Sequence, residues 1–115
     1  MLALAALAPG AAAADPRFSG QVTDALRTPT HRLLANAQSG RAVADLVFVD
    51  RQQAGTSVRT CVRRLDVEDV RTCFADATGA AGAASVTPLR FARGRYRVRW
   101  RVAGELVAEW RFKVV

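Results

Sequence analysis

The clearest pattern in the chain is an alternation of apolar and charged positions along its C-terminal segment, 94–115. In the first half apolar residues alternate with arginines, and in the second half they alternate mainly with other charged residues. The apolar positions are Tyr96, Val98, Trp100, Val102, Leu106, Ala108, Trp110, Phe112 and Val114. A period of two is typical of a strand that buries one face. The segment therefore predicts two antiparallel strands joined by a turn at 103–105.

The register of this hairpin is predicted by requiring apolar residues to oppose apolar residues. A two-residue loop at 104–105 would place Trp100 opposite Glu109 and fails this condition. A three-residue loop at 103–105 instead pairs Val102 with Leu106, Trp100 with Ala108, Val98 with Trp110 and Tyr96 with Phe112. We therefore predict the longer loop, with the aromatic side of the hairpin packed against a second layer. The expected fold-defining residues are Tyr96, Trp100, Trp110 and Phe112.

The other face of the hairpin is basic and is a candidate surface for a polyanion. Its residues are Arg95, Arg97, Arg99, Arg101, Arg111 and Lys113. The predicted register pairs Arg99 with Glu109 but sets Arg97 against Arg111, a like-charge pair. Alternate residues lie about 6.5–7 Å apart on a strand, so the arginines from Arg93 to Arg101 would form a positive stripe about 25 Å long. The alternative is a solvated outer face whose charge discourages edge pairing.

Upstream segments predict further strands at 41–50, 57–65, 70–75 and 86–91, and an edge strand around 31–37. The first of these, 41–50, is apolar on most of both faces and is expected to be central. Pro88 interrupts 86–91, which favours an edge position. About seven short strands without a convincing helix predict an all-β fold, a two-layer β-sandwich.

The N-terminal segment 1–14 is apolar, uncharged and ends in a run of alanines. This matches the apolar core and cleavage site of a secretory signal peptide, with Asp15 as the first mature residue. The basic region that normally precedes such a core is missing, so we interpret the signal peptide as truncated at its start; the alternative is an Ala-rich tail. Residues 15–115 are then expected to form a single β-sandwich domain that is secreted or located in the periplasm or cell envelope.

Cysteines and charge refine this interpretation. The chain has two cysteines, Cys61 and Cys73, which in an exported protein predict one disulfide.

The 17 basic residues exceed the 10 acidic ones, giving a net charge of +7. A basic domain of this kind suits an acidic envelope polymer, an anionic lipid or an acidic partner protein, although biased codon usage also explains many arginines. Export and the lack of aromatics on the basic strand face argue against nucleic acid.

The run Gly94-Arg95-Tyr96-Arg97-Val98 resembles the G-x-Y-x-C stretch of strand F in immunoglobulin-like domains, with Val98 where that family has cysteine. The resemblance implies an immunoglobulin-like β-sandwich that ends in an F–G type hairpin, with the Tyr96 hydroxyl bonded to upstream backbone. Because Val98 replaces the cysteine, the disulfide would be local. The hairpin is also similar to that of periplasmic copper-resistance proteins, which bind copper through an N-terminal His and further His or Met ligands. After the expected processing this chain starts at Asp15 and has one His and no Met, so that metal site does not transfer.

Candidate catalytic and metal-binding groups are sparse. His31 is the only histidine and has no neighbouring partner motif. Asp66, Glu68 and Asp69 lack the spacing of a calcium loop and are expected to form a solvated turn. We therefore predict no catalytic residue, cofactor or metal, and a non-catalytic binding or structural module of the bacterial envelope rather than an enzyme. The alternatives are a polyanion-binding protein that uses the basic strand face, and a small-ligand or metal carrier.

Overall fold

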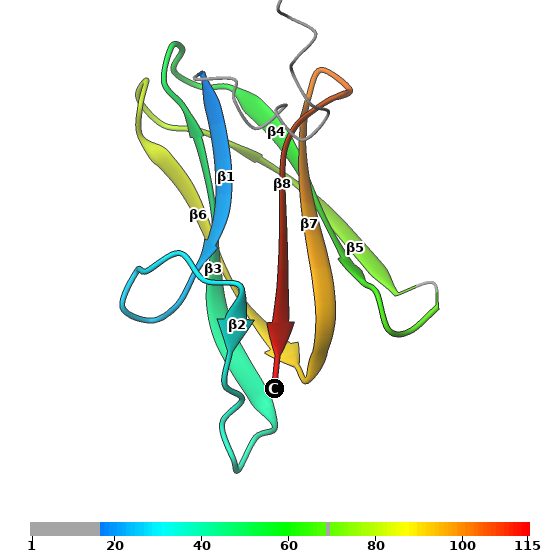
Figure 1. The fold of residues 1–115 in the computed structure, drawn as a ribbon. Helices are drawn as coiled ribbons and strands as arrows, with labels where there is room; N and C mark the ends of the chain where they lie inside the picture. Colours follow the sequence, from blue (N-terminus) through cyan, green and yellow to red (C-terminus); the bar gives the residue numbers. More distant parts are fainter. Residues whose placement is uncertain (1–16, 69) are drawn as a thin grey trace, which may run out of the picture.

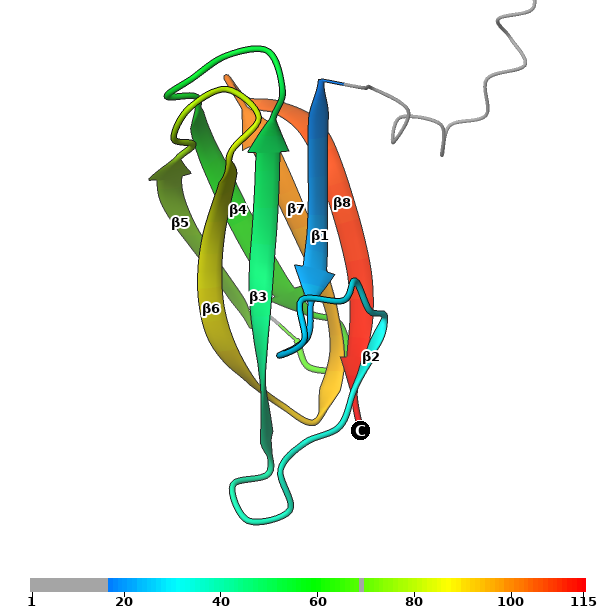
Figure 2. The ribbon, with the colours of Figure 1, turned by 90° about the vertical axis from the view of Figure 1, so that its left-hand side faces the viewer.

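The computed structural model describes residues 17–68 and 70–115, which form eight strands in two sheets (Figure 1). The three-stranded sheet has the order β1 (Phe18–Thr23), β3 (Arg41–Asp50) and β6 (Ala84–Ala92). The five-stranded sheet has the order β2 (Arg32–Leu33), β8 (Glu105–Val114), β7 (Gly94–Val102), β4 (Ser57–Arg64) and β5 (Arg71–Ala77). Figure 2 shows the smaller sheet lying in front of the larger one. The predicted all-β, two-layer architecture is confirmed, and the predicted signal peptide at 1–14 lies outside the described residues.

The core lies between the two sheets and is built from alternate residues of the strands. Its buried apolar side chains are Val22, Leu33, Ala42, Ala44, Leu46, Phe48, Val58, Val62, Phe91, Tyr96, Val98, Trp100, Phe112 and Val114. Phe91 packs edge-on against Tyr96 and Phe112, with ring centroids 5.0 Å apart in each pair. Aromatic pairs of this geometry add to the stabilisation that burial provides. Strand β7 therefore supplies the centre of the core, as its alternation predicts.

Most predicted strands are present, but the N-terminal part of the chain differs. Strand β3 is central in its sheet and β6 lies at an edge with Pro88 opposite Asp45, both as predicted. The edge strand expected around 31–37 shortens to β2, which pairs in parallel with the end of β8. The prediction of about seven strands missed β1, whose inward position 20 is glycine. A Cβ at Gly20 would collide with the Trp100 indole, so the close approach of β1 to the core leaves only Phe18 and Val22 as inward apolar residues and weakens the alternation that would reveal the strand.

The terminal hairpin has the predicted aromatic register but a different turn. Tyr96 opposes Phe112, Val98 opposes Trp110 and Trp100 opposes Ala108, as predicted. The predicted three-residue loop and the pair of Val102 with Leu106 are wrong, because the turn contains only Ala103 and Gly104 and a bulge inserts an extra residue opposite the Trp100 region. Ala103 and Gly104 have φ values of 51° and 83°, which suit a tight hairpin turn that follows the strand twist.

The bulge reconciles this turn with a buried aromatic face. A two-residue turn alone would shift β8 by one residue and point its aromatic residues outward. One extra residue in β8 restores the alternation beyond the bulge. Trp100 and Phe112 are buried as expected, whereas Trp110 is only partly buried. Its indole Nε1 donates a hydrogen bond to the carbonyl oxygen of Thr30 at 2.8 Å.

Two expected local features are also present. Cys61 and Cys73 lie directly opposite each other on β4 and β5 and form the predicted disulfide. The Tyr96 hydroxyl donates a hydrogen bond to the carbonyl oxygen of Ala92 at 2.7 Å, which ties the start of β7 to the end of β6. None of the described residues forms a helix with the length and hydropathy of a membrane span.

Candidate functional site

The outward face of the five-stranded sheet collects most of the basic side chains of its strands. We call this set the basic face: Arg59 and Arg63 of β4, Arg71 of β5, Arg95, Arg97, Arg99 and Arg101 of β7, and Arg111 and Lys113 of β8. All six residues of the predicted polyanion surface lie on it. Arg59, Arg63 and Arg71 were not included in the sequence prediction. They alternate with other residues along β4 and β5, but only the strand order places β4 beside β7 and β5 beside β4.

Four arginines of the basic face lie abreast across four strands. Arg71 opposes Arg63, Arg63 opposes Arg97, and Arg97 opposes Arg111. Neighbouring strands are about 4.8 Å apart, so these side chains leave the sheet as a closely spaced set, here called the arginine row. Like charges directly opposite each other destabilise a strand pair by about 0.2–1 kcal/mol. The arginine row therefore lowers the stability of the folded chain.

Arg97 lies in the interior of the row and is the most constrained of its members. Its Nε is buried and has no hydrogen-bond partner among the described residues. Burial lowers the pKa of Arg97, and the positive charges of Arg99, Arg111 and Arg63 lower it further, while Glu109 acts in the opposite direction. The surroundings therefore disfavour the charged form of the Arg97 guanidinium, whose Nε has no hydrogen-bond acceptor.

Glu109 is the acidic side chain of β8 that faces this cluster. Its carboxylate accepts a hydrogen bond from Arg99 Nε at 2.9 Å and a long one from Arg111 Nε at 3.5 Å. Burial raises the pKa of Glu109, but these two arginines outweigh it, so the pKa lies below its usual value. The predicted pair of Arg99 with Glu109 is present. One carboxylate is too little charge to neutralise the arginine row.

The Cys61–Cys73 disulfide lies on the same face, in the row next to the arginines. Cys61 opposes Cys73 on one side and Arg99 on the other. Strand β5 is the edge of the sheet and carries Arg71. The covalent bond therefore fixes the edge strand to β4 where like charges oppose each other.

A hollow of about 260 Å³ adjoins the arginine row at Arg111. Basic side chains of His31, Arg95, Arg111 and Lys113 line it, together with Leu65, Tyr96 and Phe112. His31 stacks on Trp110 with ring centroids 4.1 Å apart, and its Nδ1 lies 2.6 Å from the carbonyl oxygen of Arg111. The lone histidine of the sequence is therefore held against the strand that carries Arg111, with an aromatic and a backbone partner.

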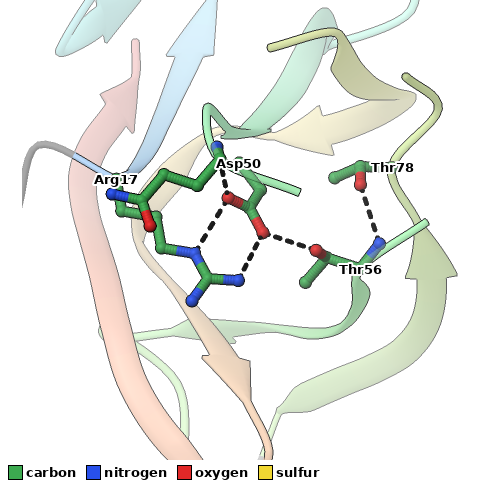
Figure 3. A network of polar contacts seen from close by, with 5 residues as sticks. Arg17, Asp50, Thr56 and Thr78 are labelled. Atoms are coloured by element: carbon green, nitrogen blue, oxygen red, sulfur yellow. Dashed lines mark hydrogen bonds and ion pairs between the residues drawn. The ribbon is translucent and has the colours of Figure 1, made fainter. Parts of the chain in front are cut away.

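A second polar cluster, around Asp50, is closed rather than open (Figure 3). The Asp50 side chain is fully buried and accepts two hydrogen bonds of 3.0 Å from Arg17 Nε and Nη2. The Thr56 hydroxyl and the Gln52 backbone N–H donate to it as well. The Arg17 hydrogen bonds, aided by Thr56, hold the pKa of Asp50 far below its usual value despite burial. This cluster ties three chain segments together and offers no acceptor to a ligand.

The acidic turn after β4 has a structural partner. The Asp66 carboxylate accepts a hydrogen bond of 3.0 Å from Arg64 Nε and one of 3.2 Å from the backbone N–H of Arg95. These contacts lower the pKa of Asp66 to about 2. Asp69, part of the same acidic turn in the sequence, lies outside the described residues. Within 17–68 and 70–115, no three His, Cys, Asp or Glu side chains gather as a metal site would require.

The basic face is thus the arrangement in the described chain that combines exposure, a strong charge and donors without acceptors. Its geometry suits binding of an anion, since guanidinium groups hold oxyanions through several hydrogen bonds at once.

Comparison with protein-family models finds no match to this chain. Comparison with curated proteins finds no significant relative either.

Proposed function

We propose that this protein is a non-catalytic binding module that holds an acidic polymer of the cell envelope on its basic face. The single observation that carries this proposal is the arginine row, in which Arg63, Arg97 and Arg111 oppose one another across neighbouring strands. Such a row costs free energy in the isolated chain. An anionic ligand would remove that cost and supply the missing acceptors.

Charge and shape of the face support a polymer as the ligand. The basic residues extend along β7 and across four strands, so a chain of anionic groups could make many weak contacts instead of one strong contact. Guanidinium groups remain charged at any physiological pH, so binding should depend on salt and hardly on pH. The face is a sheet surface, whose backbone is fixed by strand pairing before the ligand arrives.

We further propose that the sandwich has an immunoglobulin-like layout. Strands β7 and β8 would correspond to F and G, with β4 beside them as C, and strands β1, β3 and β6 of the other sheet would correspond to A, B and E. The hydrogen bond from the Tyr96 hydroxyl to Ala92 supports this assignment, because such a corner is typical of strand F.

Export of the protein is part of the same proposal. A disulfide such as Cys61–Cys73 persists in oxidising compartments, outside the cytoplasm. The apolar segment 1–14 supports the same location, because it matches the apolar core of a signal peptide. An envelope location would place the basic face next to acidic polymers.

Retention on immobilised heparin, a generic acidic polymer, tests the proposal. The native protein should be retained at low salt and elute as the salt concentration rises. The double variant Arg97→Glu/Arg99→Glu should elute near the void volume. A matched control, Arg27→Glu/Arg90→Glu, makes the same charge change at two exposed positions away from the basic face and should keep most of the retention.

Circular dichroism of both double variants would show that each is folded. The proposal is wrong if the Arg97→Glu/Arg99→Glu protein is folded and elutes with the native protein. It is also wrong if both double variants lose retention equally, because the net charge of the chain, and not the basic face, would then control binding.

A further inference from the structure

We infer that Arg63, Arg97 and Arg111 form a discrete subsite for a tetrahedral oxyanion, the phosphate or sulfate group of the ligand. The inference rests on the proposed function, because it names the chemical group that the basic face would select. It predicts a site with its own saturable affinity within a surface that otherwise attracts anions through charge alone.

The first argument is the number of donors that the chain leaves unused. Each guanidinium carries five N–H donors. The Arg63 side chain makes no hydrogen bond or ion pair with another described residue, and neither does that of Arg97. The Nε of Arg97 is buried, so the outer Nη groups of this partly exposed side chain are the donors that a ligand can reach. Arg111 contributes only its long contact of 3.5 Å to Glu109. Three adjacent side chains therefore present donors toward the same region.

The second argument is the mismatch between this set and a carboxylate. In the Asp50 cluster, one guanidinium from Arg17 binds both carboxylate oxygens. On the basic face itself, Glu109 is bound chiefly by Arg99. At both places one or two arginines make all the guanidinium contacts of the carboxylate, whose two oxygens lie in one plane. A phosphate or sulfate group has three or four oxygens that point in different directions and can accept from three guanidinium groups.

The third argument is that the site is fixed in position. Arg97 lies between Arg63 and Arg111, and its partly buried side chain is restrained by its neighbours. The Cys61–Cys73 disulfide lies one row away and limits movement of β4. Restrained donors lose little conformational entropy when they bind. The hollow beside Arg111, lined by Arg95 and Lys113, provides room for the rest of a ligand that carries the anionic group.

The experiment is a titration of the ¹⁵N-labelled protein, followed through its arginine side-chain Nε–H signals. Inorganic phosphate, sulfate and acetate are added separately at constant ionic strength. We expect the Arg97 signal to shift in a saturable way with phosphate and with sulfate. Acetate should produce only a small shift that does not saturate, because it supplies a carboxylate.

Two variants with the same charge separate the subsite from the general field of the face. Arg97→Lys keeps the positive charge but removes the planar fork of guanidinium donors, and should weaken phosphate binding about tenfold. Arg90→Lys makes the same change at an exposed position of β6, away from the basic face, and should leave the phosphate affinity unchanged. Equal effects of the two substitutions would overturn the inference.

The outcomes distinguish this inference from the proposed function. If acetate shifts the Arg97 signal as strongly as phosphate while heparin retention persists, the subsite is wrong and the polyanion surface stands. If phosphate saturates the subsite but heparin is not retained, the subsite stands and the polymer ligand is wrong. A short-chain polyphosphate that binds more tightly than inorganic phosphate would support a polymer-borne group, and equal affinities would support the free anion as the ligand.

Discussion

Two charged side chains among the described residues, those of Asp50 and Arg97, bury polar atoms in very different surroundings. Asp50 is fully buried and receives four hydrogen bonds, from Arg17, Thr56 and the Gln52 backbone. Arg97 has a buried Nε with no acceptor among the described residues, and other arginines stand on both sides of it. The Asp50 cluster is completed within the chain, whereas the arginine row is not.

The difference separates a structural ion pair from a candidate binding surface. A buried charge is tolerated when hydrogen bonds replace its hydration, as they do for Asp50. Folding brings Arg17 to Asp50 from 33 residues away, so the partner is part of the folded state. Strand pairing also places Arg63 and Arg111 directly opposite Arg97, yet these neighbours carry the same sign of charge. In our proposal, the missing acceptor of the row is the ligand.

The largest expected effect comes from removing Asp50. The Asp50→Ala substitution leaves the Arg17 guanidinium and the Thr56 hydroxyl without their acceptor, and should lower the Tm by about 10 °C or more. In added salt, which screens like-charge repulsion, the Arg97→Met substitution keeps the apolar stem of the side chain and should change the Tm by less than about 2 °C. Thermal unfolding followed by circular dichroism compares the two. Similar losses of Tm would contradict the distinction between Asp50, whose charge has hydrogen-bond partners within the fold, and Arg97, whose charge does not.

The next effect concerns the covalent bond that holds the basic face. The disulfide closes a segment with a sequence separation of 12 residues, and its removal should lower the free energy of unfolding by about 3 kcal/mol in the chain-entropy picture. Urea unfolding of the Cys61→Ala/Cys73→Ala variant, compared with the native protein, measures this loss. The native protein in a thiol reductant serves as a second version of the same experiment. An unchanged midpoint in both would show that the like-charged strands need no covalent support.

Acid should then destabilise the Asp50 cluster and leave the basic face charged. The pKa of Asp50 is lower in the folded state than in the unfolded chain, where it is near 3.8. Its contribution to stability is therefore fully present above pH 4, and is lost as the pH falls toward the folded-state pKa. Between about pH 4 and pH 2, Asp50→Asn should reduce the pH dependence of unfolding by up to about one proton.

Asp66 provides the matched comparison for this acid effect. Its pKa is also lowered, to about 2, but its side chain is partly exposed and pairs with Arg64. The Asp66→Asn substitution should therefore reduce the same slope with a smaller loss of stability at neutral pH. An unchanged slope in Asp50→Asn would show that Asp50 does not control acid unfolding.

The smallest expected effect is repulsion within the arginine row. At low salt, Arg97→Met removes two like-charge pairs and should raise the free energy of unfolding by about 0.2–1 kcal/mol for each pair. Added salt screens the same repulsion, so the gain should disappear as the ionic strength increases. Chemical unfolding in urea at two salt concentrations measures this effect, because urea adds no charge. A variant that is less stable than the native protein at low salt would show that the row stabilises the free protein.

The sequence by itself determined the features that depend on neighbouring residues along a strand. Alternation assigned Tyr96, Trp100 and Phe112 to the core, and the need to match apolar faces gave the pairs Tyr96–Phe112 and Val98–Trp110. Cysteine count and spacing gave the disulfide. These inferences succeed because a strand has a fixed period, so each side chain is inward or outward whatever lies beyond it.

Only the tertiary structure decided which strands lie side by side and which residues contact each other between them. It placed Gly20 against Trp100 and joined Arg17 to Asp50. It also inserted the bulge that keeps the aromatic register after a two-residue turn. The same strand order placed Arg63 beside Arg97 and so turned a basic stripe on one hairpin into a row across the sheet. Periodicity along a strand says which way a side chain points, whereas its neighbours are set by packing of distant segments, which no local pattern encodes.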